Sequence, residues 1–200
     1  MAVKFQFNKV SMQALQKELK IRIAALPTLK AKEAALRVTI KKEKQRLEDL
    51  RAAFAEMRDC LGESQRLFGE FPPESLSVDS VEYGADNVAG ISIPVLGEIR
   101  FIESTDSALL DPSWLPWGWQ TARELLRSRV DIDVAERRVE LLEYARKKTT
   151  QKVNLYEKVQ IPEFSEAVLK IKRYLEDVEN LEKAAQKITK AKQARAAEAA

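Results

Sequence analysis

The sequence predicts a mainly α-helical fold: a long antiparallel two-helix coiled coil whose arms are joined by a small middle region with a short β-hairpin. Apolar residues recur at steps of three and four in residues 1–64 and again in residues 121–200. Residues 65–120 instead carry β-branched residues, most of the prolines and all three tryptophans. The first and last segments carry net charges of +6 and +4, whereas the middle segment carries −7. We therefore expect three domains with these boundaries: an N-terminal coiled-coil arm, a middle region and a C-terminal coiled-coil arm.

The first arm has the pattern of one helix over about residues 8–64, which would be about 85 Å long at 1.5 Å per residue. Its apolar stripe keeps the a and d spacing of a coiled coil over more than three heptads, and in that stretch only Glu43 is not apolar. Gly62 and the glycine and prolines at 69–73 are typical of a helix end. The stripe consists of Met12, Leu15, Leu19, Ile23, Leu26, Leu36, Ile40, Leu47, Leu50, Phe54, Met57 and Leu61.

The last arm is expected to begin at Thr121, which would cap the helix with Glu124 at the capping-box position. Arg146 and Thr149 are the polar members of its stripe. The tail after Ala185 is rich in good helix formers but has little to bury, so we expect its end to fray. The apolar members are Leu125, Ile132, Ala135, Val139, Leu142, Val153, Tyr156, Phe164, Val168, Ile171, Leu175, Val178 and Ala185.

The two arms should pair antiparallel, because each has one narrow apolar stripe that needs a partner. Successive steps of four mark stutters, which locally undo a supercoil and so should lie at one level in both strands. They occur around Leu19 in the first arm and around Phe164 in the second. Aligning them pairs residues whose numbers add to 187, which also places Pro27 opposite Gln160, beside Pro162. We therefore expect the two prolines to mark a bend or a change of supercoil, not a helix end.

The middle region predicts a short hairpin with strands at residues 77–83 and 88–93 around the turn sequence Gly-Ala-Asp-Asn, at one end of the coiled coil. The following stretch DPSWLPWGWQ, residues 111–120, is expected to be a loop because it contains two prolines. Its tryptophans, Trp114, Trp117 and Trp119, either pack on the helix end and hairpin as a small core or form an exposed docking site.

The sequence contains little that could carry out catalysis. It has no histidine, no phosphate-binding glycine loop and no pair of cysteines, so we expect no catalytic site, no cofactor and no metal site. The single Cys60 cannot form an internal disulfide, and the carboxylates Glu48 and Asp49 lie on a charged helix face. No apolar run is long enough to span a membrane, and the N-terminal residues lack the apolar core of a signal peptide. These features favour a soluble cytoplasmic interaction protein.

A cluster of basic residues in each arm is the most specific candidate surface. At the register given above, Lys41 faces Arg146, so the two clusters would form a basic collar at one level of the coiled coil. An acidic protein partner is favoured over nucleic acid, because no aromatic residues are interleaved and the net charge is only +3. A solvated face is the alternative for either cluster alone. The basic collar consists of Arg37, Lys41, Lys42, Lys44, Arg146, Lys147 and Lys148.

The stretch TTQKVNLYEKVQIP, residues 149–162, resembles a segment of the D subunit family of V-type and archaeal A-type ATPases that usually reads T-x-R-R-V-N-A-L-E-x-V-x-I-P. Gln151, Leu155 and Tyr156 depart from that pattern. DNVAGISIP, residues 86–94, resembles the family's N-x-x-G-[VI]-x-[VI]-P, and residues 29–32 and 175–192 resemble its first and final helices. The tryptophan-rich stretch has no counterpart in the family pattern. The matching positions, which we call the family-motif segment, are Thr149, Lys152, Val153, Asn154, Glu157, Val159, Ile161 and Pro162.

The resemblance implies a central-stalk rotor of a V/A-type ATPase or ATP synthase. Its partners would be the catalytic hexamer of A and B subunits, an F subunit on its side and the subunit that couples it to the ion-translocating membrane ring. It would be non-catalytic and peripheral at the cytoplasmic face of the membrane, without inserting into it. The hairpin and tryptophan stretch would lie at its lower, membrane-proximal end, with Tyr83, Asn87, Gly90, Pro94, Trp114, Trp117 and Trp119. A free-standing coiled-coil adaptor or holding chaperone is the alternative that the residues alone leave open.

Overall fold

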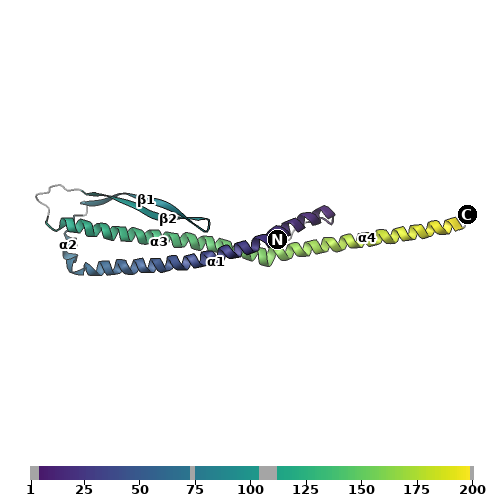
Figure 1. The fold of residues 1–200 in the computed structure, drawn as a ribbon, viewed down its shortest axis with the longest axis horizontal. Helices are drawn as coiled ribbons and strands as arrows, with labels where there is room; N and C mark the ends of the chain where they lie inside the picture. Colours follow the sequence, from purple (N-terminus) through teal and green to yellow (C-terminus); the bar gives the residue numbers. More distant parts are fainter. Residues whose placement is uncertain (1–4, 73–74, 104–111, 199–200) are drawn as a thin grey trace. The chain divides into compact units, whose positions relative to one another are not determined.

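The computed structural model describes residues 5–72, 75–103 and 112–198 and confirms the mainly helical fold class with a small antiparallel hairpin in the middle (Figure 1). The chain divides into two compact units, unit 1 with residues 1–31 and 149–200 and unit 2 with residues 32–148. Its elements are α1 (Lys9–Cys60), η1 (Gly62–Ser64), α2 (Gln65–Gly69), β1 (Leu76–Val88), β2 (Ile91–Glu103), α3 (Leu115–Leu155), the π-helical turn η2 (Tyr156–Gln160) and α4 (Ile161–Glu198).

The predicted antiparallel pairing of the arms is confirmed by ion pairs between them within each unit. In unit 1, Lys30 Nζ lies 2.6 Å from Glu157 Oε1. In unit 2, Lys44 Nζ lies 2.6 Å from Glu143 Oε1, and the Arg51 guanidinium lies 2.8 Å from Glu136 Oε1. The numbers of these three pairs add to 187, the predicted sum. The contacts of Arg22 with Gln160 and of Glu43 with Arg138 add to 182 and 181 instead, so the predicted register does not hold for every contact. The hydrogen bond that Glu136 accepts raises the pKa of Arg51 above its ordinary value.

The core of unit 2 is built from both helical arms and the hairpin. Leu36, Ile40 and Leu142 form one buried cluster with Ile93 of β2. Val88 and Ile91, which flank the hairpin turn, are half-buried against that cluster. A second cluster of Leu47, Ile132 and Ala135 continues the contact between α1 and α3, with Leu50 and Phe54 beside it. The predicted stripe therefore supplies the buried residues, and the hairpin covers part of the paired helices.

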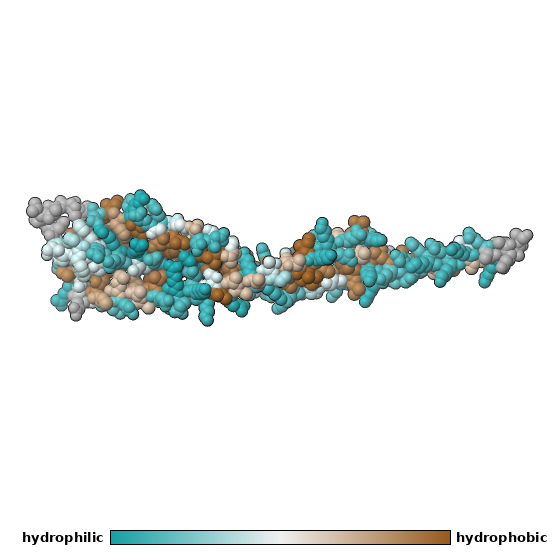
Figure 2. All heavy atoms as spheres, in the orientation of Figure 1, coloured by the Kyte–Doolittle hydropathy of each residue, from teal (hydrophilic) through white to brown (hydrophobic). Residues whose placement is uncertain are grey.

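The core of unit 1 joins the start of α1 to α4. Leu15, Ala167 and Ile171 are buried, and Phe5, Met12, Phe164, Val168 and Leu175 pack against them. Asn8 caps α1, because its Oδ1 accepts a hydrogen bond of 2.6 Å from the backbone N–H of Ser11. Figure 2 shows apolar side chains gathered on this paired part of unit 1 and a mostly hydrophilic surface along the later part of α4.

Neither proline of the two arms ends a helix, as the sequence predicted. α1 continues through Pro27. Before Pro162 the helix widens into η2 and then continues as α4, so that the helical path runs unbroken from Leu115 to Glu198. In the described part of the tail α4 continues to Glu198, and the predicted fraying stays a prediction. Alanine, lysine, glutamine and arginine, which dominate this tail, have high intrinsic helix propensity.

The predicted strand boundaries are wrong. The strands extend over Leu76–Val88 and Ile91–Glu103, and the turn is the dipeptide Ala89-Gly90, with φ of 52° and 74°. Two successive positive φ angles form a type I′ turn, whose twist matches that of the flanking strands. Gly84 and Asn87, which the sequence predicts as turn residues, lie in β1 opposite Val95 and Ser92.

The hairpin also does not stay at one end of the coiled coil. Its turn lies against the start of the unit 2 helices, where a Cβ built on Gly90 would be 3.7 Å from Lys32 Nζ. Burial of Ile93 on Leu36 and Leu142 explains this position, because the apolar face of the hairpin needs cover that the paired helices provide. Two register shifts, between Val78 and Ser80 and between Val81 and Tyr83, interrupt the strand pairing.

The predicted helix start at Thr121 is also wrong, because α3 begins six residues earlier at Leu115. Pro116 lies in the first turn, where its missing N–H would have had no helical partner in any case. Thr121 is no cap, since its hydroxyl donates to the Trp117 carbonyl. Most of the predicted tryptophan loop is therefore helix, and its first residue, Asp111, lies outside the described residues.

Candidate interaction surfaces

The basic collar residues lie in unit 2 at the level of the hairpin turn. Lys41, Lys42, Lys147 and Lys148 are exposed, and among the described residues none of them has an ion pair. Two others already have partners, since Arg37 pairs with Glu33 and Lys44 with Glu143. Because the hairpin covers one side of the helices at this level, the basic residues form an open patch and not a closed ring.

Arg146 differs from the rest of the collar. Its side chain is half-buried, and its Nε is buried without a hydrogen-bond partner among the described residues. Lys148 is also partly engaged, with its ammonium 5.4 Å from the centre of the Tyr144 ring. Lys41, Lys42, Lys147 and Lys148 are therefore the members of the collar that are best placed to meet a partner.

The family-motif segment lies in unit 1 on the last turns of α3, on η2 and at the start of α4. Thr149 is buried and Val153 and Ile161 are half-buried, whereas Lys152, Asn154 and Pro162 are exposed. Glu157 is tied to Lys30 across the helix pair. The segment thus combines seam positions with an exposed polar face.

Arg22 and Gln160 form a contact around η2 that the sequence did not predict. Arg22 Nε donates to Gln160 Oε1 at 2.8 Å, and its guanidinium carbon lies 4.4 Å from the centre of the Phe164 ring. A groove of about 500 Å³ opens beside this contact, lined partly by Leu29 and Tyr156. The sequence feature that could have indicated this contact is the run of stripe positions spaced by four residues, because such spacing fits a π-helical turn as well as a stutter.

The contact between Arg138 and Glu43 was not predicted either. The Arg138 guanidinium lies 2.8 Å from Glu43 Oε1, and both side chains are nearly buried, with 9% and 13% of their surface exposed. Glu43 Oε2 and Arg138 Nε have no hydrogen-bond partner among the described residues. Glu43 is the one charged residue in the otherwise apolar stripe between Leu36 and Leu61. Because a buried carboxylate requires a partner, the sequence could have predicted a basic residue opposite it.

The tryptophans mostly form the small core that was one of the two sequence-based alternatives. Trp119 Nε1 donates to the hydroxyl of buried Ser75 at 3.1 Å, and the Trp114 ring lies 6.3 Å from that of Phe71. Trp117 lies 5.7 Å from the Phe68 ring but remains 44% exposed. The end of unit 2 therefore offers one exposed tryptophan over a packed aromatic base.

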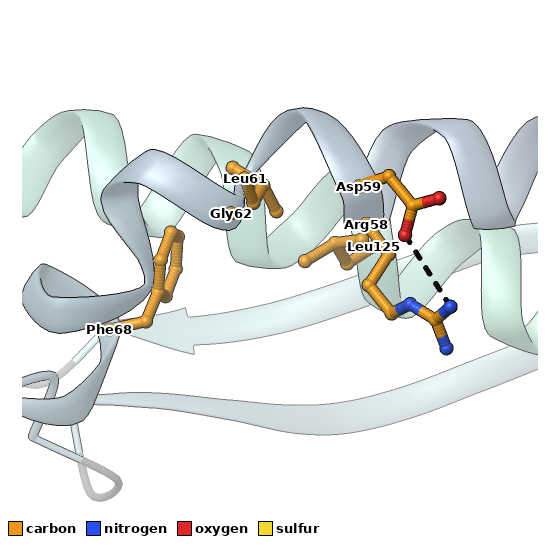
Figure 3. Close-up of a pocket in the computed structure, with 6 residues that line it drawn as sticks. All are labelled: Arg58, Asp59, Leu61, Gly62, Phe68 and Leu125. Atoms are coloured by element: carbon orange, nitrogen blue, oxygen red, sulfur yellow. Dashed lines mark hydrogen bonds and ion pairs between the residues drawn. The ribbon is translucent and has the colours of Figure 1, made fainter.

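A cavity of about 610 Å³ lies near this aromatic base (Figure 3). Leu61, Phe68 and Leu125 give it apolar walls, and the ion pair between Arg58 and Asp59 lies at its edge. Leu67 and Leu126, elsewhere on α2 and α3, are also exposed apolar residues. The two elements thus carry exposed apolar surface together with charge.

The remaining hairpin candidates lie apart from the aromatic base. Tyr83 is 61% exposed and Asn87 is exposed, whereas Pro94 is half-buried opposite Ala85. Gly90 forms the turn beside Lys32. The structure therefore separates two groups that the sequence predicts to lie together.

Within the described ranges, no group of three or more metal-ligating side chains comes together. The same residues include no helix that combines the length and apolarity needed to cross a bilayer.

Comparison with known proteins identifies clear relatives. A family model that describes the D subunit of ATP synthase matches residues 11–191. The chain is 29% identical over 183 residues to the V-type ATP synthase D subunit of Chlamydia muridarum, covering 88% of this chain and 90% of the relative. It is 30% identical over 167 residues to the protein of that name from Chlamydia felis, covering 79% and 80%. The corresponding protein of Borreliella burgdorferi is 28% identical over 176 residues, covering 87% of each chain.

Proposed function

The chain belongs to the ATP synthase D subunit family, and from this premise we propose that it is the non-catalytic central-stalk rotor of a V/A-type ATPase. It passes torque between a catalytic hexamer of A and B subunits and the membrane ring that moves ions. The observation that carries this proposal is the unbroken helical path from Leu115 to Glu198, held to α1 by ion pairs at one register in each unit. Paired helices resist twisting better than a single chain.

The later part of α4 supports insertion of unit 1 into a hexamer cavity. The core of unit 1 reaches Leu175, and the described side chains of α4 after Val178 are exposed, so this part of α4 extends as a single helix. About 20 residues at 1.5 Å each give about 30 Å of unpaired helix. Leu181 and Ile188 on this stretch are 71% and 59% exposed. A narrow tip with apolar side chains suits a confined central cavity.

The end of unit 2 supports the opposite role. In our proposal the exposed Trp117 and the apolar cavity beside Leu61 face the subunit that couples the stalk to the membrane ring. An F subunit binds the side of the stalk, and the whole assembly is peripheral at the cytoplasmic face. The lack of lysine in residues 65–120 distinguishes this end from the basic collar.

Copy number tests the proposed function against the adaptor alternative. A tagged chain expressed in its own cells should purify with the hexamer subunits at one copy per hexamer. A free-standing adaptor or chaperone would instead self-associate or bring down varied clients in varied amounts. Native mass spectrometry of the purified material decides between these results.

The four exposed collar lysines are expected to bind acidic groups of the hexamer. Replacing Lys41, Lys42, Lys147 and Lys148 by glutamate should leave the helix content unchanged and weaken hexamer binding about tenfold or more at low salt. Added salt should reduce the difference, because it screens exposed charges. Arg146 is left unchanged, because replacing its half-buried side chain would affect folding as well as binding.

Exchange of Arg137 and Glu140 for each other is the matched control. It keeps the net charge and an exposed ion pair of unit 2 outside the collar, so hexamer binding should match that of the wild type. If the fourfold variant also binds like the wild type at low salt, the collar is a solvated face and has no role in assembly.

A further inference from the structure

The π-helical turn η2 carries one residue more than an α-helical turn. The backbone N–H of Ile161 donates to the Tyr156 carbonyl, five residues back, where an α-helix would use the fourth. The wider turn suits Pro162, which lacks an N–H and whose ring would press on the Lys158 carbonyl in a regular α-helix. The extra residue is therefore built into the sequence at this point.

The same turn keeps the apolar stripe on one face. Tyr156, Gln160, Phe164 and Val168 are spaced by steps of four. In a helix of 3.6 residues per turn, each such step advances the stripe by about 40°, so three of them would turn it away from α1. The extra residue absorbs most of that drift, which is why both Tyr156 and Phe164 reach the same side chain of α1.

That side chain is Arg22. Its guanidinium carbon lies 6.0 Å from the centre of the Tyr156 ring and 4.4 Å from that of Phe164, and its Nε bonds to Gln160. On its own helix, Arg22 pairs with Glu18 and donates to the Glu18 carbonyl at 3.0 Å. One planar side chain therefore contacts the first residue of η2, its last residue and α4 beyond it.

The π-helical turn is only partly enclosed by its described neighbours. The groove of about 500 Å³ beside η2 gives the turn room to shift, and the exposed Leu155 and Val159 show that its outer side is uncovered within the described residues. A π turn can move along a helix when neighbouring backbone hydrogen bonds change partner in sequence. Such a move would twist one part of the helix relative to the next.

We propose that Arg22 is a positioning residue that holds the extra residue of η2 at its place in the helix. It thereby prevents α4 from rotating about the helix axis relative to α3. Its importance for torque rests on the proposed rotor function, whereas the clamp itself is a property of unit 1. Arginine suits this position because its guanidinium plane stacks on aromatic rings while its edge donates hydrogen bonds.

Amide hydrogen exchange of the full chain tests the clamp. Replacing Arg22 by glutamine should speed exchange in residues 153–165 about tenfold, equivalent to about 1.4 kcal/mol, and leave residues 32–148 unchanged. Arg22→Lys should restore little of the protection, since it keeps the charge but loses the planar contacts. Arg37→Gln is the matched control, because Arg37 is exposed and its ion pair among the described residues is with Glu33 of the same helix. Unchanged exchange in Arg22→Gln would overturn the clamp.

A shortened helix separates a clamp from general packing. Deleting Lys158 and replacing Pro162 by alanine removes both the extra residue and the proline, so a regular α-helix can form with both flanks in phase. In this background, Arg22→Gln should no longer change the exchange of residues 153–165. Equal acceleration with and without the extra residue would show that Arg22 only packs, and would overturn the proposal.

The assembled ATPase tests the link to torque separately. Arg22→Gln should lower the number of ions moved per ATP hydrolysed while leaving the rate of hydrolysis near that of the wild type. If exchange is accelerated but the coupling ratio is unchanged, the clamp is real and the torque-bearing role proposed for this segment is contradicted.

Discussion

Replacing Arg138 by leucine should lower the free energy of unfolding of unit 2 by about 3 kcal/mol or more. The substitution leaves the Glu43 carboxylate nearly buried in the helix pair without the guanidinium that lies 2.8 Å away. A buried charge without a partner has lost its hydration, and no ion pair or hydrogen bond compensates for that cost. Urea unfolding followed by circular dichroism measures the loss.

The neighbouring Arg137 is the matched control. It is exposed and, among the described residues, pairs with Glu140 alone, on its own helix, so Arg137→Leu should cost about 0–1 kcal/mol. A similar loss for both variants would mean that the Glu43–Arg138 pair has no special place in the core.

Replacing both members of the buried pair by leucine separates stability from register. Glu43 Oε2 and Arg138 Nε lack hydrogen-bond partners among the described residues. The attraction within the pair therefore offsets only part of the free-energy cost of removing both charges from water. The double variant should therefore be at least as stable as the wild type. We expect the pairing register of this variant to be less well defined. This would show as weaker selectivity of thiol crosslinks between cysteines placed at residues 44 and 143, whose side chains meet in the wild type, with Cys60 removed. Undiminished selectivity would contradict the register role.

The second large effect is expected from Leu142→Ala. Leu142 is fully buried between Leu36, Ile40 and Ile93, so its truncation removes contacts of both helical arms and the hairpin at once. The loss of buried apolar surface and the remaining cavity should cost about 2–5 kcal/mol. Because Ile93 loses its support, amide exchange should rise in residues 88–95 as well as in the helices.

Leu126 offers the matched control, since it lies on the same helix but is 37% exposed. Leu126→Ala should cost less than about 1 kcal/mol and leave exchange in the hairpin unchanged. If Leu142→Ala destabilises the helices without affecting residues 88–95, the hairpin is held by some other contact.

The helix pairing could be predicted from sequence because it depends on periodicity. The stripe from Leu36 to Leu61 predicted the face of α1 that is buried, and the stutters predicted antiparallel arms, with Lys44 and Glu143 paired at the expected sum but Glu43 and Arg138 paired at 181. The strand boundaries could not, because Gly84 and Asn87 are good turn residues locally, and only packing of Ile93 on the helices selects the turn at Ala89-Gly90.

Local breaker residues gave wrong predictions for the same reason. Pro116 suggested a loop, yet a proline in the first helical turn costs no hydrogen bond, and Trp119 on this helix donates to Ser75, which is distant in sequence. Gly97 lies at a register shift where a Cβ would be 2.9 Å from the Glu82 carbonyl oxygen. These constraints arise from residues distant in sequence.

Rotation of a probe on Cys60 tests the central claim most directly. Cys60 is the only cysteine and is exposed at the end of α1, so a bead can be attached to the unaltered chain. With the catalytic hexamer held on a surface and ATP supplied, the proposed rotor function predicts stepwise rotation of the bead in one direction. A bead that stays fixed relative to the hexamer while ATP is hydrolysed would contradict it.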